Sequence, residues 1–69
     1  MFKLRIKEFA AARGWTLKEV SERSALPYST VATYANSPGM TMVNLISVLK
    51  LARIFGVSIE DLMEVVEEN

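Results

Sequence analysis

The chain has 69 residues, of which 51% are hydrophobic, and eight basic side chains balance eight acidic ones to a formal net charge of zero. A chain of this length suits one small domain, whose folding buries only about 60% of the surface of the unfolded chain. Cysteine and histidine are absent, which excludes disulfides and thiolate metal sites and removes the most common general base.

Neither a membrane span nor a signal peptide is expected. The longest run without a charge, residues 24–49, is interrupted by Pro27, Pro38 and Gly39, so it does not have the character of a transmembrane helix. Charges also recur within the first eight residues, unlike the apolar core of a signal peptide. We predict a single domain over residues 1–69, located in the cytoplasm and not bound to a membrane.

The charges are distributed unevenly along the chain. Residues 1–59 carry a balance of +5, whereas residues 60–69, which include Glu67 and Glu68, carry −5. A cationic body suits a nucleic-acid surface, and an anionic end suits a solvated or partner-facing segment. Acidic residues near a terminus are equally consistent with an ordinary solvated helix.

The first helix is predicted over residues 2–13. Phe2, Ile6 and Phe9 recur at helical spacing, and Gly14 follows as a C-terminal cap would. Trp15 could stack on a base, but a tryptophan directly before a helix N-cap more often packs on the core. We therefore expect Trp15 to belong to the core.

Residues 16–24 and 27–36 are predicted to form two short helices joined by a tight turn. Thr16 is a good N-cap, with Glu19 at the capping-box position, and Pro27 fits the first turn of the second helix. In the second helix Val31 and Tyr34 face inward, and the opposite face is small and polar. A short helix, a turn and a second helix with such a face form the unit that enters a DNA major groove.

The rest of the chain is predicted to be a loop and two further helices. The loop contains an apolar group, Met40, Met42 and Val43, which could fold over the core or contact another subunit. A helix over residues 45–55 has Asn44 as its cap, and one over residues 59–67 has Ser58. The predicted buried residues of these two helices are Leu45, Val48, Leu49, Ala52 and Phe55, then Ile59, Leu62, Met63 and Val66. The prediction is an all-α fold of five helices without a strand.

Several short motifs follow one another in a specific order. They are Arg13-Gly14-Trp15-Thr16, Val20, Ala25-Leu26, Ser29-Thr30-Val31, Asn36, Asn44-Leu45 and the segment from Leu51 to Ser58. With them the chain resembles the phage repressor and Cro-type (Xre family) helix-turn-helix domain, from about Leu4 to Leu62. The resemblance implies five helices, dimeric DNA binding and control of transcription. By position, it implies that Tyr28, Ser29 and Thr33 face bases and that Asn36 faces the DNA backbone.

The chain departs from the family pattern at three places. Leu17 stands where the family usually has a phosphate-binding glutamine, and residues 37–43 lack the basic residues often found there. Many members pair an arginine with a glutamate at the positions of Ala10 and Ala35. Loss of both partners avoids stranding a buried charge, which would cost about 3–5 kcal/mol.

The residues available for DNA recognition are mostly hydroxyl-bearing. The predicted reading helix has neither arginine for guanine nor glutamine for adenine, so specificity should be modest and assisted by DNA shape. The predicted base-reading residues are Tyr28, Ser29, Thr30, Ala32 and Thr33, and the predicted backbone contacts are Lys18, Asn36 and Arg23.

The function that these features favour is a sequence-specific DNA-binding transcriptional regulator, in the form of a dimeric repressor that reads an inverted repeat. The alternative is a protein-interaction module or antitoxin of the same fold with weak or no specific DNA binding. An enzyme is not expected, and neither is a metal or another cofactor, because the chain has no histidine, no cysteine and no glycine-rich phosphate loop with which its carboxylates could act. The predicted dimer or partner surface consists of Met40, Met42, Val43, Met63 and Val66.

Overall fold

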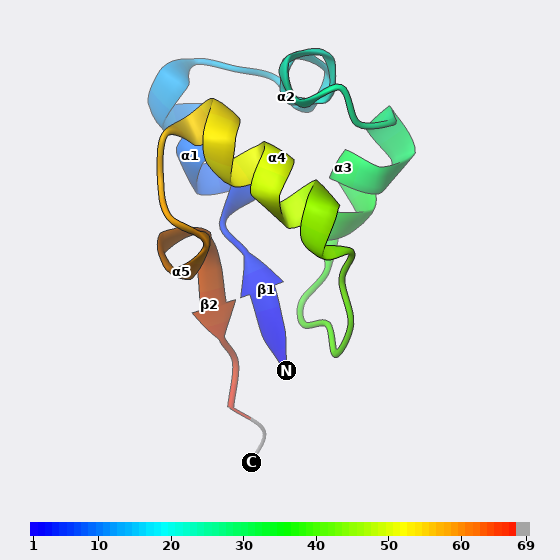
Figure 1. The fold of residues 1–69 in the computed structure, drawn as a ribbon, viewed down its shortest axis with the longest axis vertical. Coiled ribbons are helices and arrows are strands. Elements are labelled where there is room, and N and C mark those ends of the chain that lie inside the picture. Colours follow the sequence, from blue (N-terminus) through cyan, green and yellow to red (C-terminus); the bar gives the residue numbers. More distant parts are fainter. Residues whose placement is uncertain (68–69) are drawn as a thin grey trace.

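The computed structural model describes residues 1–67, which form a helical body and a small sheet near the two termini (Figure 1). Helix α4 crosses the body, with α1, α2 and α3 arranged around it, and α5 leads into the sheet. The elements in chain order are β1 (Phe2–Leu4), α1 (Ile6–Arg13), α2 (Leu17–Ser24), α3 (Tyr28–Asn36), α4 (Leu45–Phe55), α5 (Ile59–Leu62) and β2 (Met63–Val65). The predominantly helical fold class is confirmed.

Side-chain caps define where three helices begin. The amide of Glu19 donates to Thr16 Oγ1 at 3.1 Å, and the amide of Ser47 donates to Asn44 Oδ1 at 3.1 Å. Ser58 Oγ accepts from the amide of Asp61 at 3.0 Å. Each bond satisfies a backbone donor that the first turn of a helix leaves unpaired, so the three predicted N-caps are confirmed.

The prediction that the chain contains no strand is wrong at both ends. Residues 2–4 form β1 instead of a first turn of helix, and the helix predicted over residues 59–67 ends at Leu62, where β2 follows. The strands pair antiparallel, with Lys3 opposite Glu64, and a bridge from Phe2 to Met40 closes the other edge of β1. Of the residues assigned to that last helix, Val66 and Glu67 lie beyond β2, and the neighbouring acid Glu68 lies outside the described residues.

The sheet has a clear physical origin. Leu4 is buried and Phe2 and Lys3 are half-buried, and a strand over these three residues competes with the helical period seen in Phe2, Ile6 and Phe9. The partners that decide between them are distant in sequence: the Arg5 amide donates to the carbonyl of Leu62 at 2.8 Å, and the Val66 amide to that of Met1 at 2.9 Å.

The core is built on one side of α4. Phe55 and Leu51 are fully buried there, together with Ile6, Val20, Val31, Val48 and Leu62 from all parts of the chain. The predicted buried face of α4 was misplaced, because Leu45 is exposed and Leu49 is only half-buried. The side chains that point inward are Ser47, Val48, Leu51, Ala52 and Phe55.

An aromatic cluster joins α1, the connection between α1 and α2, and α4. The rings of Trp15 and Phe55 stack with centroids 5.8 Å apart, and Phe9 lies 5.6 Å from Phe55 on another side, so the expectation that Trp15 packs on the core is confirmed. The guanidinium of Arg13 lies over all three rings and donates to the carbonyls of Phe9 and Phe55. Arg13 thereby satisfies the carbonyl of Phe55, the last residue of α4, and links it to the middle of α1. Within residues 1–67, no helix has the length and apolar character needed to cross a bilayer.

Candidate nucleic-acid interface

The turn between α2 and α3 holds these helices at a fixed angle. Ala25 adopts a left-handed conformation with φ of 60°, and Leu26 is buried directly after it. The hydroxyl of Ser21 donates to the carbonyl of Leu26 at 2.6 Å, and the Leu26 amide donates back to the carbonyl of Ser21 at 3.3 Å. Pro27 then supplies the backbone geometry for the start of α3. The turn predicted at Ala25-Leu26-Pro27 is therefore present, and hydrogen bonds to α2 and the start of α3 fix its conformation.

Helix α3 is anchored by one face and exposed on the other. Val31 is fully buried, and the hydroxyl of Tyr34 accepts from the Asn44 amide at 3.2 Å, which ties α3 to the start of α4. Tyr28, Ser29 and Thr33 are exposed on the outer face. The structure therefore orients these three predicted base-reading side chains outward from a rigid support.

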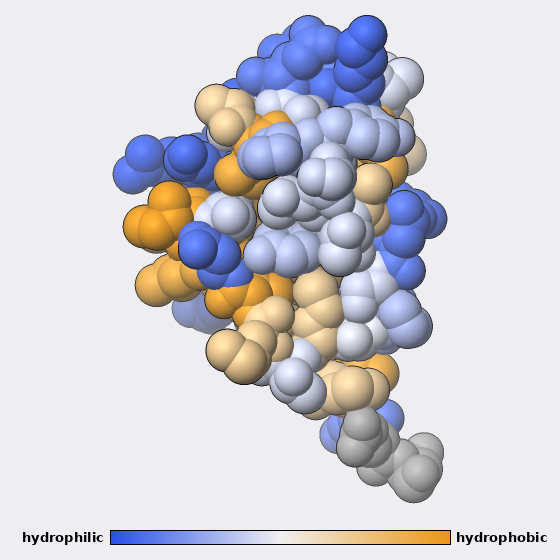
Figure 2. Space-filling view, turned by 90° about the vertical axis from the view of Figure 1, so that its right-hand side faces the viewer, coloured by the Kyte–Doolittle hydropathy of each residue, from blue (hydrophilic) through white to orange (hydrophobic). Residues whose placement is uncertain are grey.

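The other three candidates on α3 are placed differently. Thr30 and Ala32 are half-buried at the sides of the outer face. Asn36 is exposed, but its amide group already donates one hydrogen bond to the carbonyl of Ala32 at 2.9 Å. Because the amide carries two N–H donors, a second donor remains available for a phosphate oxygen. Figure 2 shows the resulting surface as a pale band of small polar residues between strongly hydrophilic α2 and an apolar area.

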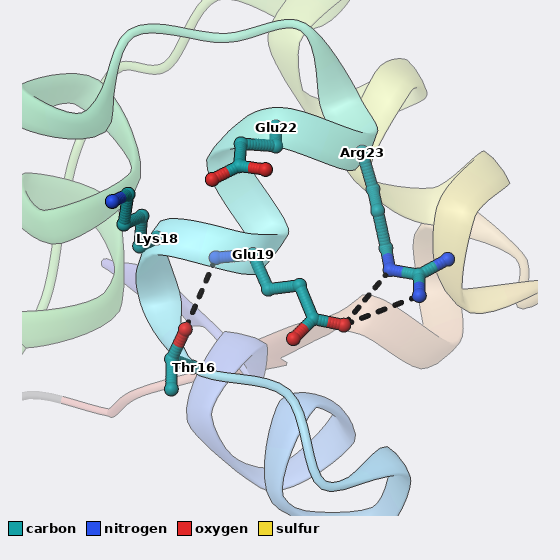
Figure 3. A pocket seen from close by; sticks show the side chains of 5 residues that line it. All are labelled: Thr16, Lys18, Glu19, Glu22 and Arg23. Carbon is teal, nitrogen blue, oxygen red and sulfur yellow. Dashed lines mark hydrogen bonds and ion pairs between the residues drawn. The ribbon is translucent and has the colours of Figure 1, made fainter.

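The two cations of α2 are in different situations. Lys18 is exposed and has no ion pair within residues 1–67, and in Figure 3 it extends on the side of α3. Arg23 points the other way, where its Nε and Nη2 atoms lie 3.2 and 3.1 Å from Glu19 Oε2. Its guanidinium also lies 4.2 Å from the centre of the Trp15 ring. Lys18 is thus the better placed of the two predicted backbone ligands.

The shallow hollow in which these side chains lie is open to solvent and mixed in charge. Its lining consists of Thr16, Lys18, Glu19, Glu22 and Arg23. Glu19 occupies the capping-box position but bonds to Arg23 instead of closing the box. The hollow therefore offers one unpaired cation beside an exposed carboxylate, Glu22, rather than a concentrated anion site.

Two more cations are paired with an acidic side chain of the sheet. Lys3 and Arg5 each lie 3.7 Å from the carboxylate of Glu64. The cationic body and the acidic end inferred from the sequence therefore neutralise each other in part. The basic side chains without an acidic partner within residues 1–67 and without a carbonyl contact of the Arg13 kind are Lys7, Lys18, Lys50 and Arg53.

The residues of the predicted partner surface differ in their exposure. Met40, Val43 and Met63 pack against the core, and Val66 is half-buried. Met42 is strongly exposed. The sequence analysis missed Leu45 and Ile46, which are exposed in the first turn of α4 close to Met42 in sequence. Ile46 stands two residues before Val48 and therefore lies on the opposite side of the helix, whereas Leu45, three residues before Val48, is exposed at the edge of the buried face.

The sequence pattern of the Cro/C1-type helix-turn-helix DNA-binding domain matches residues 5–68. The chain belongs to this family. The match begins directly after β1, so this strand lies outside the matched region. The family is one of DNA-binding domains and not of enzymes.

A solved structure supports the same fold for this Cro/C1-type domain. A crystal structure of a candidate DNA-binding protein from Bacteroides fragilis matches with a TM-score of 0.74 and 20% sequence identity. The match covers 93% of this chain and 100% of the other. Comparison with curated proteins finds no match.

Proposed function

We propose that this Cro/C1-type domain is a sequence-specific transcriptional regulator that binds DNA as a homodimer and represses by occupying its operator. The observation that carries the proposal is the exposed, uncharged face of α3 on a helix whose other face is fixed to the core. Such a helix can present the exposed side chains of Ser29 and Thr33 to base edges in a major groove.

The proposed readout uses hydroxyl groups and small apolar contacts. Ser29 and Thr33 would reach base edges, with Tyr28 and Thr30 at the sides of the contact, and Ala32 would contact a thymine methyl group. A hydroxyl can donate or accept and so discriminates weakly between bases. Specificity per subunit is therefore modest, and water bridges and DNA shape contribute to it.

A homodimer compensates for weak readout by one subunit. Two subunits that read half-sites about 34 Å apart double the number of contacts. The sheet end of the molecule, with Met63 and Val66 and the exposed Val65 beside them, is the subunit contact that we favour. Symmetric contact there leaves α3 free for DNA.

The test is selection of binders from a random duplex library at near-physiological salt, followed by affinity measurements on the enriched sequence. An inverted repeat with half-sites about one helical turn apart would support the proposal. The double variant Ser29→Ala/Thr33→Ala should then bind the enriched and a scrambled duplex with similar affinity, while its melting temperature stays at that of the parent. Lys7→Ala, at an exposed position of α1, serves as the control and should keep the preference for the enriched duplex. Retention of the parent's sequence preference by the double variant would show that α3 is not the reader.

A second candidate function is favoured by the lack of charge on α3. The segment from residue 24 to residue 49 carries no charged side chain, although phosphate contacts dominate the affinity of most DNA-binding proteins. A protein-interaction module or antitoxin of the same fold would fit this feature. Weak, salt-sensitive binding of all duplexes without an enriched motif would favour this second function.

A further inference from the structure

Helix α4 has two opposite faces of the same spacing. The buried face consists of positions 47, 48, 51, 52 and 55. The outer face, two residues out of step, consists of Leu45, Ile46, Leu49, Lys50 and Arg53. A surface helix ordinarily carries polar residues opposite its buried face. In α4 the first half of the outer face is apolar and the second half is cationic.

The apolar half of this outer face is open to solvent. The relative exposure is 61% for Leu45 and 59% for Ile46, and that of Met42, just before the helix, is 85%. In Figure 1, α4 lies at the front of the molecule and no other element crosses it. Figure 2 shows the corresponding apolar area next to the pale band of α3. Contiguous exposed apolar side chains of this kind are typical of protein interaction surfaces.

The charges on α4 select the kind of occupant. Lys50 and Arg53 are exposed one to two turns after Ile46, and neither forms an ion pair within residues 1–67. The helix itself, from residue 45 to residue 55, contains no acidic residue. Symmetric packing of α4 against α4 of a second copy would therefore gather four cations near two positively polarised helix N-termini. Such like charges oppose this arrangement.

DNA fits this face less well than protein does. Phosphates could contact Lys50 and Arg53, but they would leave Met42, Leu45 and Ile46 against a polar, hydrated backbone. Burial of apolar area stabilises a complex by about 25 cal/mol for each Å², and only an apolar partner surface supplies it. The occupant must therefore combine apolar side chains with carboxylates.

We propose that the outer face of α4 docks an acidic amphipathic helix of a different protein. The apolar side chains of that helix cover Met42, Leu45 and Ile46, and its carboxylates contact Lys50 and Arg53. An antiparallel orientation places those carboxylates in the first turn of the partner helix, where they also interact favourably with its own dipole. The expected partner sequence thus has acidic residues about one to two turns before a set of apolar residues spaced i, i+3 or i+4. This inference does not depend on the proposed DNA readout.

The test uses a displayed library of helical peptides with one randomised face, selected on the wild-type domain. Binders to the variant Lys50→Glu/Arg53→Glu are removed by counter-selection. We expect enrichment of peptides with acids before the apolar residues, and a synthetic consensus peptide should bind with a micromolar dissociation constant. Its affinity should fall at least tenfold for Ile46→Ser and for Lys50→Glu/Arg53→Glu. A peptide with lysines in place of its acids should recover binding to the charge-reversed variant.

The controls separate this proposal from its alternatives. Lys7→Glu, which reverses an exposed cation on α1, should leave peptide binding unchanged, and all variants should melt within a few degrees of the wild type. Absence of an acidic–apolar consensus would overturn the proposal. So would sedimentation showing a wild-type dimer that Ile46→Ser dissociates, because the occupant would then be a second copy. Loss of duplex binding by Lys50→Glu/Arg53→Glu without any peptide enrichment would assign the face to DNA.

Discussion

Replacing Lys18 with alanine tests how the domain holds the DNA backbone. Only Lys7, Lys18, Lys50 and Arg53 have neither an acidic partner nor a carbonyl contact within residues 1–67. Each phosphate contact contributes about 0.9 to the slope of log K against log salt, so the slope should not exceed about 4 for each subunit. Lys18→Ala should reduce it by about 0.9 per subunit. When the salt concentration rises from 50 to 200 mM, the variant should therefore lose less affinity than the wild type. The difference is a factor of about 3.5 for one subunit and about 10 for a dimer.

The assay is fluorescence anisotropy with the selected duplex and a scrambled duplex across that salt range. Lys18→Ala should weaken both complexes by the same factor, because a phosphate contact carries no sequence information. Arg23→Ala is the informative comparison, since the Arg23 guanidinium already bonds to Glu19 and stacks on Trp15. Arg23→Ala should lower the melting temperature and leave the slope of log K against log salt nearly unchanged. An unchanged slope for Lys18→Ala, or a slope change in Arg23→Ala as large as the one expected for Lys18, would refute the assignment of Lys18 as the phosphate ligand.

Two further predictions concern stability. Ala25→Gly should raise the free energy of unfolding by about 1 kcal/mol, because Ala25 has a φ of 60° that glycine adopts without strain. Ala12→Gly in exposed, helical α1 should lower it by about the same amount, and thermal unfolding of the pair would contradict this reasoning if both variants were destabilised. Arg13→Lys should cost about 1–2 kcal/mol despite the retained charge, because lysine lacks the planar fork that reaches two carbonyls over three rings. Urea unfolding measures it, and a lysine variant as stable as the wild type would show that charge alone suffices.

The helices that the sequence predicted well have local causes. Thr16, Asn44 and Ser58 were recognisable as caps because a cap bonds within three residues of itself. The same locality made the turn at Ala25 and the inward face of α3 predictable. Gly14 ends α1 in a left-handed conformation, as predicted, and Gly56 ends α4 in the same conformation.

The errors in the fold have non-local causes. Whether Phe2 belongs to a helix or a strand depends on Val65 and Met40, which the sequence does not place near it. Tertiary context overrode a short helical pattern in which only a few residues recur. Leu45 was assigned to the core because it stands three residues before Val48, but it lies in the first turn of α4 at the edge of the buried face and is exposed. Hydrophobicity alone does not identify the buried face when a helix is apolar on two sides.

The outward orientation of the candidate DNA-reading side chains was predictable from the sequence, but the pairing of the surrounding charged side chains was not. The helical period showed that Ser29 and Thr33 point away from Val31, and the structure exposes them. It did not reveal that Glu64 neutralises Lys3 and Arg5 across the sheet, nor that Trp15 covers Arg23. Those pairings depend on strand register and on side-chain packing between elements, which one sequence does not determine.

The two proposed binding faces lie next to each other, so their ligands should be coupled. An acidic helix on α4 would engage Lys50 and Arg53, two of the four cations that have neither an acidic partner nor a carbonyl contact within residues 1–67, and would bring negative charge beside α3. The affinity for DNA should therefore fall by about five- to tenfold at saturating consensus peptide, and DNA should lower peptide affinity by the same factor because linkage is reciprocal. Anisotropy titrations of the duplex with and without the peptide measure this coupling, and Lys50→Glu/Arg53→Glu should abolish it. Equal duplex affinities with and without bound peptide would show that the two faces act independently.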